Sequence, residues 1–268
     1  MTPKQNNSLL LLKFLLSLIL FAFITISSLA QTSTELFRVK SRHATQAVAV
    51  DSLHFYAISN ARIVKYRKTS QDSIATWSGP LKHLNSGIVI QGKLYCVNSN
   101  YPEKPMASSV EIFDPKTLQH IGNHSFGIYE GSCTWLDWYQ GHWYAYFAQY
   151  ENDGGEPGKG VAYSTLVQFD AEWRRTASWI LPKTLVERLR PMNLSGGTFN
   201  KDGLLYCSPH HDLELYILRI PKIGYELEWL KTISVPFQGQ GIAIDRFQKN
   251  VLYGIHRGNR EVIALKLE

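Results

Sequence analysis

Residues 193–206 read NLSGGTFNKDGLLY and contain the pattern that decides the fold of this chain. A run that begins with small residues leads into the turn Lys201-Asp202-Gly203, and Leu205-Tyr206 follows shortly after it. Two short apolar segments joined by a turn that contains Asp and Gly are typical of a β-hairpin. This stretch therefore predicts a pair of antiparallel strands.

The same arrangement recurs along the chain, marked each time by an apolar residue followed by tyrosine. The five dipeptides are Phe55-Tyr56, Leu94-Tyr95, Trp143-Tyr144, Leu205-Tyr206 and Leu252-Tyr253. Successive tyrosines are 39, 49, 62 and 47 residues apart. A period of this size predicts a repeat architecture, in which each unit is one small supersecondary structure.

Further alternating segments follow each dipeptide, for example residues 63–66, IVKY, and four of the units have a fourth segment. Short strands separated by turns rich in Gly, Asn and Asp are typical of propeller blades. The fifth unit has three segments, and residues 36–40, LFRVK, form an alternating stretch without another partner. We therefore predict an all-β protein, a β-propeller of five blades with four strands each. In this prediction the mature N-terminal strand joins the C-terminal blade and closes the ring.

Two other architectures would accommodate the same segments: an open β-sandwich, and a six-bladed ring with one degenerate blade. Helical signal is confined to residues 182–190, PKTLVERLR, where a proline stands at the start and Leu185 and Leu189 are four residues apart. This segment predicts one or two helical turns between the third and fourth blades.

The first thirty residues have the composition of a signal peptide. Lys4 and Lys13 are positively charged, residues 14–26 are apolar, and Ser28-Leu29-Ala30 has small residues where cleavage requires them. We predict that residues 1–30 are removed and that residues 31–268 form a single propeller domain, secreted or periplasmic. The alternative is an uncleaved anchor, although the run is short for a membrane span. No membrane span is expected after cleavage.

Removing residues 1–30 would leave 26 basic and 22 acidic side chains, a net charge of +4. The basic residues are scattered, whereas nucleic-acid binding needs a concentrated basic face, so we expect no nucleic-acid partner. The three cysteines, Cys96, Cys133 and Cys207, lie in apolar strand-like stretches. Their odd number and their surroundings favour buried thiols over a disulfide framework. We expect a monomer.

The predicted topology brings two sets of loops to one face, which we name the top face. They are the loop before the first strand of each blade and the loop after its second strand. Five of the nine histidines fall in these loops, and loops on a rigid frame commonly carry function. The candidate ligand-binding residues are His43, His83, Asn98, Asn100, Tyr101, Tyr129, Gln149, Gln238, His256 and Arg257.

Two insertions enlarge the top face. Residues 101–108, YPEKPMAS, form a proline-bearing loop, and residues 151–160, ENDGGEPGKG, form a glycine-rich loop of the kind that acts as a lid or stays disordered. Aromatic residues crowd the third blade, at Trp135, Trp138 and Trp143. They either form platforms for flat ligands or, as is more common, pack between neighbouring blades.

The sequence contains fewer signals for catalytic residues than for ligand-binding residues. His210 and His211 are the candidate general bases, and imidazoles from different blades could converge on zinc, although no H-E-x-x-H motif is present. The top loops contain one clear carboxylate, Glu130, whereas glycoside hydrolysis needs two. No G-x-S-x-G motif is present for a nucleophilic serine.

Residues 129–144, YEGSCTWLDWYQGHWY, resemble the E-G-x-x-W stretch of SMP-30/gluconolactonase-like propellers, and residues 193–206 are similar to their D-G-x-L-Y stretch. This resemblance implies that Glu130 and Asn193 bind a divalent cation such as calcium. That family usually has six blades, and its third ligand, an aspartate, falls near Gln238 or Gln240 in this chain. Residues 83–87, HLNSG, and residues 99–102, SNYP, also resemble stretches of a group of secreted bacterial propellers, some of them labelled lactonase-like or cycloisomerase.

Two functions remain open. The first is an exported propeller that binds a small molecule, glycan or protein partner on its top face. The second is a metal-dependent hydrolase or isomerase acting on a lactone or sugar-derived substrate. In the second, calcium or zinc held by Glu130 and Asn193 would polarise a carbonyl group or activate a bound water.

Overall fold

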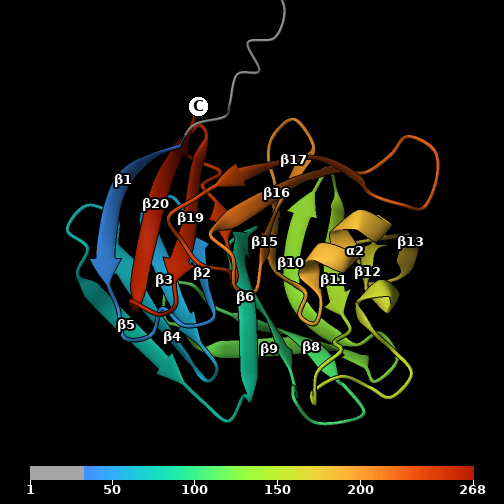
Figure 1. The fold of residues 1–268 in the computed structure, drawn as a ribbon. Helices are drawn as coiled ribbons and strands as arrows, with labels where there is room; N and C mark the ends of the chain where they lie inside the picture. The colour runs from blue at the N-terminus through green and yellow to red at the C-terminus, as the bar shows by residue number, and fades with distance from the viewer. Residues whose placement is uncertain (1–32) are drawn as a thin grey trace, which may run out of the picture. The chain divides into compact units, whose positions relative to one another are not determined.

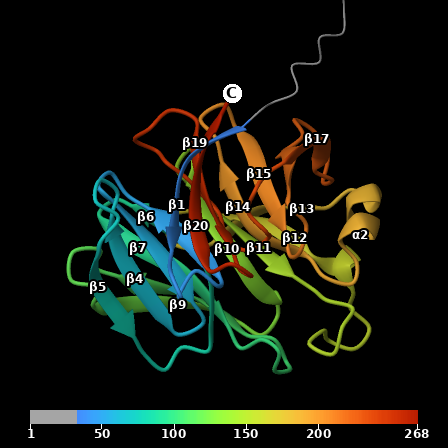
Figure 2. The same cartoon turned by 60° about the vertical axis from the view of Figure 1, so that its left-hand side comes forward.

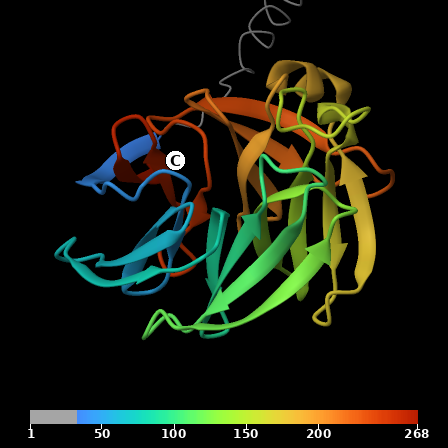
Figure 3. The same ribbon diagram turned by 90° about the horizontal axis from the view of Figure 1, so that it is seen from below.

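A computed structural model describes residues 33–268, which form five antiparallel sheets of four strands each. The sheets follow one another around a common centre in chain order, as the colours from blue to red show in Figure 3. The prediction of an all-β propeller with five four-stranded blades is confirmed, and the sandwich and six-bladed alternatives are wrong. The predicted signal peptide, residues 1–30, lies outside the described residues.

Each blade runs from an innermost strand to an outermost strand, and Figure 1 labels most of the strands. In that order they are β2 (Ala47–Val50), β3 (His54–Ser59), β4 (Arg62–Arg67) and β5 (Ser73–Ser78) in blade 1; β6 (His83–Ile90), β7 (Lys93–Ser99), β8 (Ser108–Phe113) and β9 (His120–Gly127) in blade 2; β10 (Ser132–Tyr139), β11 (His142–Ala148), β12 (Thr165–Phe169) and β13 (Arg175–Ile180) in blade 3; β14 (Leu194–Phe199), β15 (Leu204–Pro209), β16 (Glu214–Arg219) and β17 (Glu228–Ser234) in blade 4; and β18 (Ala243–Ile244), β19 (Val251–His256), β20 (Glu261–Leu267) and β1 (Ser33–Lys40) in blade 5.

The repeated apolar-tyrosine dipeptide lies in the second strand of every blade, and all five of its tyrosines are buried. In blade 4 the turn before this strand is closed by the side chain of Asn200. Its Oδ1 accepts hydrogen bonds from the amides of Asp202 and Leu204, at 3.0 and 2.8 Å. Gly203 completes the turn with a φ of +82°, a conformation that glycine adopts without strain.

Blade 5 combines strands from both ends of the described chain. Strand β1 pairs antiparallel with β20, with Arg38 opposite Ile263, and Figure 2 shows the two side by side. Glu261, at the start of β20, forms ion pairs with Lys40 and Arg38 at 2.9 and 2.5 Å. The hydrogen bond from Lys40, together with that from Arg38, lowers the pKa of Glu261 to about 2. The carboxylate is therefore charged at neutral pH and links the two strands.

Apolar cores lie between neighbouring blades, and aromatic side chains supply much of their volume. Trp135 and Tyr146 stack at 5.7 Å between blades 3 and 4, and Trp143 and Trp173 stack at 4.9 Å. These aromatic residues of blade 3 are packing residues, as the more common interpretation predicted. The three cysteines are buried and free, which agrees with the prediction of buried thiols.

The predicted helical segment is confirmed as α2 (Lys183–Leu189), which lies between blades 3 and 4 in the chain. Its buried Leu185, Val186 and Leu189 belong to the same apolar cluster as Trp135. A short 3-10 helix, η1 (Val161–Tyr163), precedes β12. None of the helices within residues 33–268 is long and apolar enough to cross a membrane.

The five innermost strands approach the axis so closely that small residues are needed there. Gly241 forms a parallel bridge with Ala47 of blade 1, and a Cβ atom on Gly241 would lie 2.7 Å from the carbonyl oxygen of Asn85. A Cβ atom on Gly197 would overlap the indole ring of Trp135. Farther along these strands the space at the centre is only about 10 Å³, too small for a ligand.

A buried carboxylate joins three blades at the opposite end of the axis. Asp137, at 2% exposure, accepts hydrogen bonds from the amides of Phe199 and Trp138, at 2.6 and 2.9 Å. It also forms an ion pair with Arg246, which follows β18. Because these partners come from blades 3, 4 and 5, the side chain fixes the relative positions of three innermost strands.

We expect Gly197→Ala to lower the free energy of unfolding by about 1–3 kcal/mol, since the added methyl group overlaps the Trp135 ring. The matched control is Gly122→Ala in β9, where no atom lies within 4 Å of an added Cβ atom, and we expect a change below about 0.5 kcal/mol. Urea unfolding measures both values. Equal stability of the two variants would contradict close packing at the axis.

We expect Asp137→Ala to lower the free energy of unfolding by about 3–5 kcal/mol, because it leaves Arg246 and two amides without their buried acceptor. Asp202→Ala, in the exposed turn before β15, is the control and should cost less than about 0.5 kcal/mol. The urea midpoints of the two variants provide the comparison. A loss for Asp137→Ala no larger than for the control would refute the link between blades.

Candidate functional site

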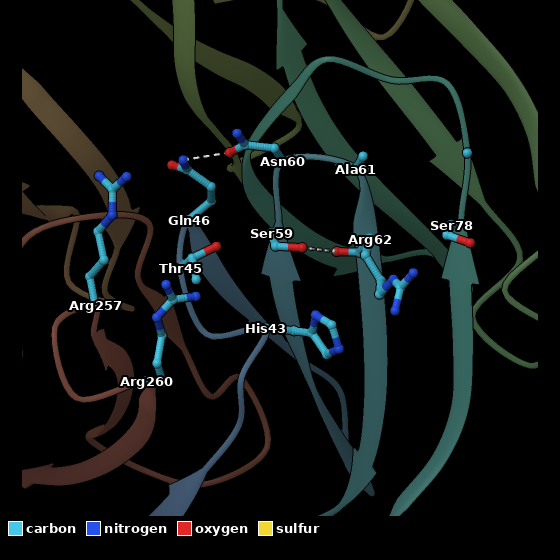
Figure 4. A pocket seen from close by; sticks show the side chains of 11 residues that line it. His43, Thr45, Gln46, Ser59, Asn60, Ala61, Arg62, Ser78, Arg257 and Arg260 are labelled. Atoms are coloured by element: carbon cyan, nitrogen blue, oxygen red, sulfur yellow. Dashed lines mark hydrogen bonds between the residues drawn. The ribbon is translucent and has the colours of Figure 1, made fainter.

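A cleft opens on the top face across blades 1 and 5, and we name it the arginine cleft. Its volume is about 760 Å³, within the usual range for small-molecule sites. Its walls are the loop before β2, the turns β3–β4 and β19–β20, and the end of β5. The residues that line it, shown in Figure 4, are His43, Thr45, Gln46, Ser59, Asn60, Ala61, Arg62, Ser78, Gly79, Arg257 and Arg260.

Two amide side chains fix the positions of the loops within blade 1. Gln46 donates from Nε2 to Oδ1 of Asn60 at 2.6 Å, so the loop before β2 is bonded to the turn between β3 and β4. The carbonyl oxygen of Asn60 accepts the amide of Leu84 in blade 2, at 3.0 Å. The amide of Gln46 donates to the carbonyl oxygen of Ile58 in β3, and the carbonyl oxygen of Gln46 accepts the amide of Gly241 in blade 5. This wall is therefore preorganised by the strands behind it.

The charge of the cleft is strongly positive. Arg62, Arg257 and Arg260 line it and Arg42 lies beside His43, yet none of the four has a carboxylate partner within 4 Å in residues 33–268. Arg42 instead donates to Nε2 of His43 at 2.9 Å, and Arg260 donates to the carbonyl oxygen of Arg42. Burial lowers the pKa of His43, and the charges of Arg42, Arg62 and Arg260 lower it further. Four guanidinium groups are thus concentrated without a neutralising anion.

Arg257 also acts on two histidines from other blades. The pKa of His83 is lowered to about 4, first by burial and then by the charge of Arg257. The pKa of His210 is likewise lowered to about 4, by burial, His211, Arg257 and His83. His210 Nδ1 lies 2.9 Å from Nε2 of His211. The structure therefore brings His83, His210 and Arg257 into electrostatic contact, with both imidazoles neutral at pH 7.

The two predicted insertions contact each other beside His83. Tyr101 lies 5.6 Å from the His83 ring and 4.9 Å from that of Tyr150, between ring centroids. Nδ2 of Asn152 donates to the Tyr101 hydroxyl at 3.2 Å, and Glu156 accepts the amide of Met106 at 2.8 Å. The glycine-rich loop is thus bonded to the proline-bearing loop.

Two predicted ligand-binding asparagines have structural partners. Asn98 accepts the amide of His83 at 3.1 Å. Asn100 accepts the amide of Ala107 at 2.7 Å and donates to the carbonyl oxygen of Pro105 at 2.9 Å. Asn98 therefore holds the start of β6, and Asn100 holds the loop that carries Tyr101.

Gln238 and His256 shape the loop that carries Arg257. They face each other in a parallel bridge, and the amide of Gln238 donates to the carbonyl oxygen of Ile255 at 3.1 Å. His256 Nδ1 accepts the amide of Asn259 at 3.1 Å, which closes the turn between β19 and β20. These two residues therefore position the blade 5 wall.

The remaining predicted residues lie at the top of blade 3. Tyr129 is 86% exposed, and Glu130 forms an ion pair with Arg175 at 3.1 Å. Gln149 is buried, and its Nε2 donates to the carbonyl oxygen of Glu130 at 3.3 Å. None of these residues lines the arginine cleft.

The predicted cation ligands are both engaged by protein groups. Asn193 is buried; its Oδ1 accepts from Tyr146 and its Nδ2 donates to Ser164 and to the carbonyl oxygen of Gln149, all at 2.7 Å. The carboxylate of Glu130 is paired with Arg175. Within residues 33–268 no group of three or more His, Cys, Asp or Glu side chains converges as metal ligands would. These two side chains do not fit a shared cation site as they stand, and the cation at Glu130 and Asn193 stays a prediction.

Of the residues that line the arginine cleft, the sequence pattern indicated His43 and Arg257 but not Arg62 and Arg260. All four residues lie in loops that were predicted to reach the top face. Arg62 and Arg260 close the turns after the second strands of blades 1 and 5, and both turns contain an asparagine. The signal was available, since a count of charges over whole turns would have shown an excess of arginine.

Fold and site together define a five-bladed β-propeller with a positively charged, donor-lined cleft on one face. Among solved structures the chain is similar to the glutaminyl cyclase of Myxococcus xanthus, with a TM-score of 0.58 and 12% sequence identity over 89% of this chain and 97% of that chain. It is also similar to the WD40 repeats of RRP9, with a TM-score of 0.50 and 10% identity over 83% and 79%. No protein-family model and no curated protein matches it. At such identities the similarity concerns the fold alone.

The lowered pKa values of His83 and His210 predict a stability that depends on pH. Between about pH 6.5 and 4 the unfolded chain binds these protons while the folded protein does not, so stability should fall as the pH falls through this window. The double variant His83→Gln/His210→Gln should show a flatter dependence there, measured as urea midpoints at pH 7 and 4.5. The urea midpoints of variant and parent at pH 8 show how much stability the substitutions cost through lost packing, apart from any effect of protonation. Parallel curves for variant and parent would contradict the prediction.

Proposed function

We propose that this protein is a binding propeller and that it takes a polar small molecule or glycan in the arginine cleft. The observation that carries the proposal is the set of guanidinium groups without carboxylate partners around a preorganised cleft of about 760 Å³. Guanidinium groups that are not neutralised by the protein form strong, charge-assisted hydrogen bonds with a ligand anion. The predicted signal peptide extends the proposal to an exported protein.

The lining of the cleft supports a polar ligand. Thr45, Ser59 and Ser78 contribute hydroxyl groups, and Gln46 and Asn60 contribute amides. Ala61 is the largest purely apolar side chain among the residues that line the cleft. A ligand there would gain hydrogen bonds and ion pairs rather than apolar contact.

Only the binding function is proposed. The hydrolase hypothesis depends on a cation at Glu130 and Asn193, and both side chains have protein partners. His210 and His211, the candidate general bases, lie outside the arginine cleft. The glutaminyl cyclase has a similar fold at 12% identity, and this similarity assigns no residue of the cleft a role.

A thermal-shift screen of mono- and oligosaccharides and small organic acids tests the proposal. We expect at least one compound to raise the melting temperature through binding in the cleft. Arg257→Ala should weaken its affinity about tenfold or more, because a charge-assisted hydrogen bond is lost, and His43→Ala should weaken it as well. Isothermal titration calorimetry measures these affinities.

Arg67→Ala is the matched control. Arg67 ends strand β4, whose other end is Arg62, and it is exposed without a carboxylate partner in the described chain. Its removal should leave the affinity unchanged. The proposal is refuted if no compound stabilises the protein, or if binding persists undiminished in Arg257→Ala and His43→Ala.

A further inference from the structure

The guanidinium groups of the arginine cleft are divided between two walls. Figure 4 shows Arg257 and Arg260 on the side of blade 5, and Arg62 with His43 on the side of blade 1. The walls come from opposite ends of the described chain, since one belongs to the turn β3–β4 and the other to the turn β19–β20. A ligand that pairs with both walls must present anionic groups at two separate places.

The middle of the cleft has a different chemistry from its two walls. Gln46 and Asn60 lie between them and bond to each other, with the hydroxyls of Thr45 and Ser59 nearby. Amides and hydroxyls are both donors and acceptors, which suits the hydroxyl groups of a polyol. The ligand should therefore be hydroxylated between its charged ends.

We infer that the ligand of the arginine cleft is an acidic saccharide with two anionic groups, one paired with Arg62 and the other with Arg257 and Arg260. This inference rests on the proposed function and adds the chemical class of the ligand. Carboxylate and sulfate both match the planar fork of arginine, so uronates and sulfated sugars share the required chemistry. The volume of about 760 Å³ is large enough for a disaccharide.

Other polyanions fit the lining less well. A nucleotide base needs an aromatic or broad apolar surface for stacking, and no Phe, Tyr or Trp is among the residues that line the cleft. An acidic peptide would supply carboxylates but no row of hydroxyl groups for the amides and hydroxyls in the middle of the cleft. Tighter binding of an acidic peptide is therefore one of the outcomes that the test distinguishes.

The experiment measures five probes on the purified protein by isothermal titration calorimetry. They are galacturonic acid, digalacturonic acid, a disulfated carrageenan disaccharide that has no carboxylate, the neutral disaccharide maltose and a tetraglutamate peptide. We expect one of the two dianionic disaccharides to bind most tightly, with an affinity that falls as salt rises. Which of the two binds identifies carboxylate or sulfate as the source of the charge.

Variants of each wall then test the two-point contact. Arg62→Ala and Arg257→Ala should each weaken binding of the dianion at least about tenfold, and Arg67→Ala should not change it. In the Arg62→Ala variant the dianion should retain no more affinity than the monoanionic galacturonic acid has in the parent. Only a ligand that contacts both walls would lose the part of its affinity that its second anionic group contributes.

The outcomes separate the inference from the function on which it rests. If maltose binds as tightly as the dianions, or if the two arginine variants have no effect on a bound dianion, the inference is wrong and a binding cleft stands. If tetraglutamate binds more tightly than either disaccharide, the saccharide assignment is overturned in favour of an acidic peptide. If none of the five probes binds while another compound of the thermal-shift screen does, the inference alone fails. If nothing in the probes or the screen binds, the proposed function fails with it.

Discussion

The close approach of five innermost strands at the axis is the constraint on which the rest of this structure depends. It requires small residues such as Ala47, Gly197 and Gly241, because a larger side chain would overlap the backbone or ring of a neighbouring blade. The bridge between Gly241 and Ala47 brings blade 5 against blade 1. Next to Asp137 and Gly197 the space between these strands is only about 10 Å³, whereas the arginine cleft is formed by loops on the top face.

That packing also explains why an unfavourable set of charges can persist on the top face. Four arginines near one cleft repel each other, and no carboxylate of the described residues compensates them. The loops nevertheless stay in place, because Gln46 bonds to both neighbouring strands and to Asn60. The apolar cores between blades provide the stability that such a cleft requires. Blade 5 also shows the opposite arrangement, in which the carboxylate of Glu261 neutralises both Arg38 and Lys40.

Much of the architecture could be predicted from local patterns. The recurring apolar-tyrosine dipeptide, the turns of Asn, Asp and Gly and the period-two alternation predicted five blades of four strands, and residues 182–190 predicted the helix. These patterns are local, since hairpin pairing and strand alternation depend on residues close in the chain. The candidate site was predicted only in part. Of the predicted site residues, His43 and Arg257 line the arginine cleft, whereas Asn98, Asn100 and Asn193 form hydrogen bonds within the protein.

The sequence by itself determined the repeat, the number of blades and the face to which the polar loops project, because each of these follows from the order of short segments. Only the tertiary structure decided which of those loops meet. Arg62 and Arg260 are almost 200 residues apart in the chain, and they share a cleft because packing at the axis sets blade 5 beside blade 1. Glu130 and Asn193 lie closer in sequence, and the tertiary structure gives each side chain its own protein partner, Arg175 for Glu130 and Tyr146 for Asn193. Proximity between loops of different blades depends on the curvature and closure of the whole ring, and no local pattern encodes it.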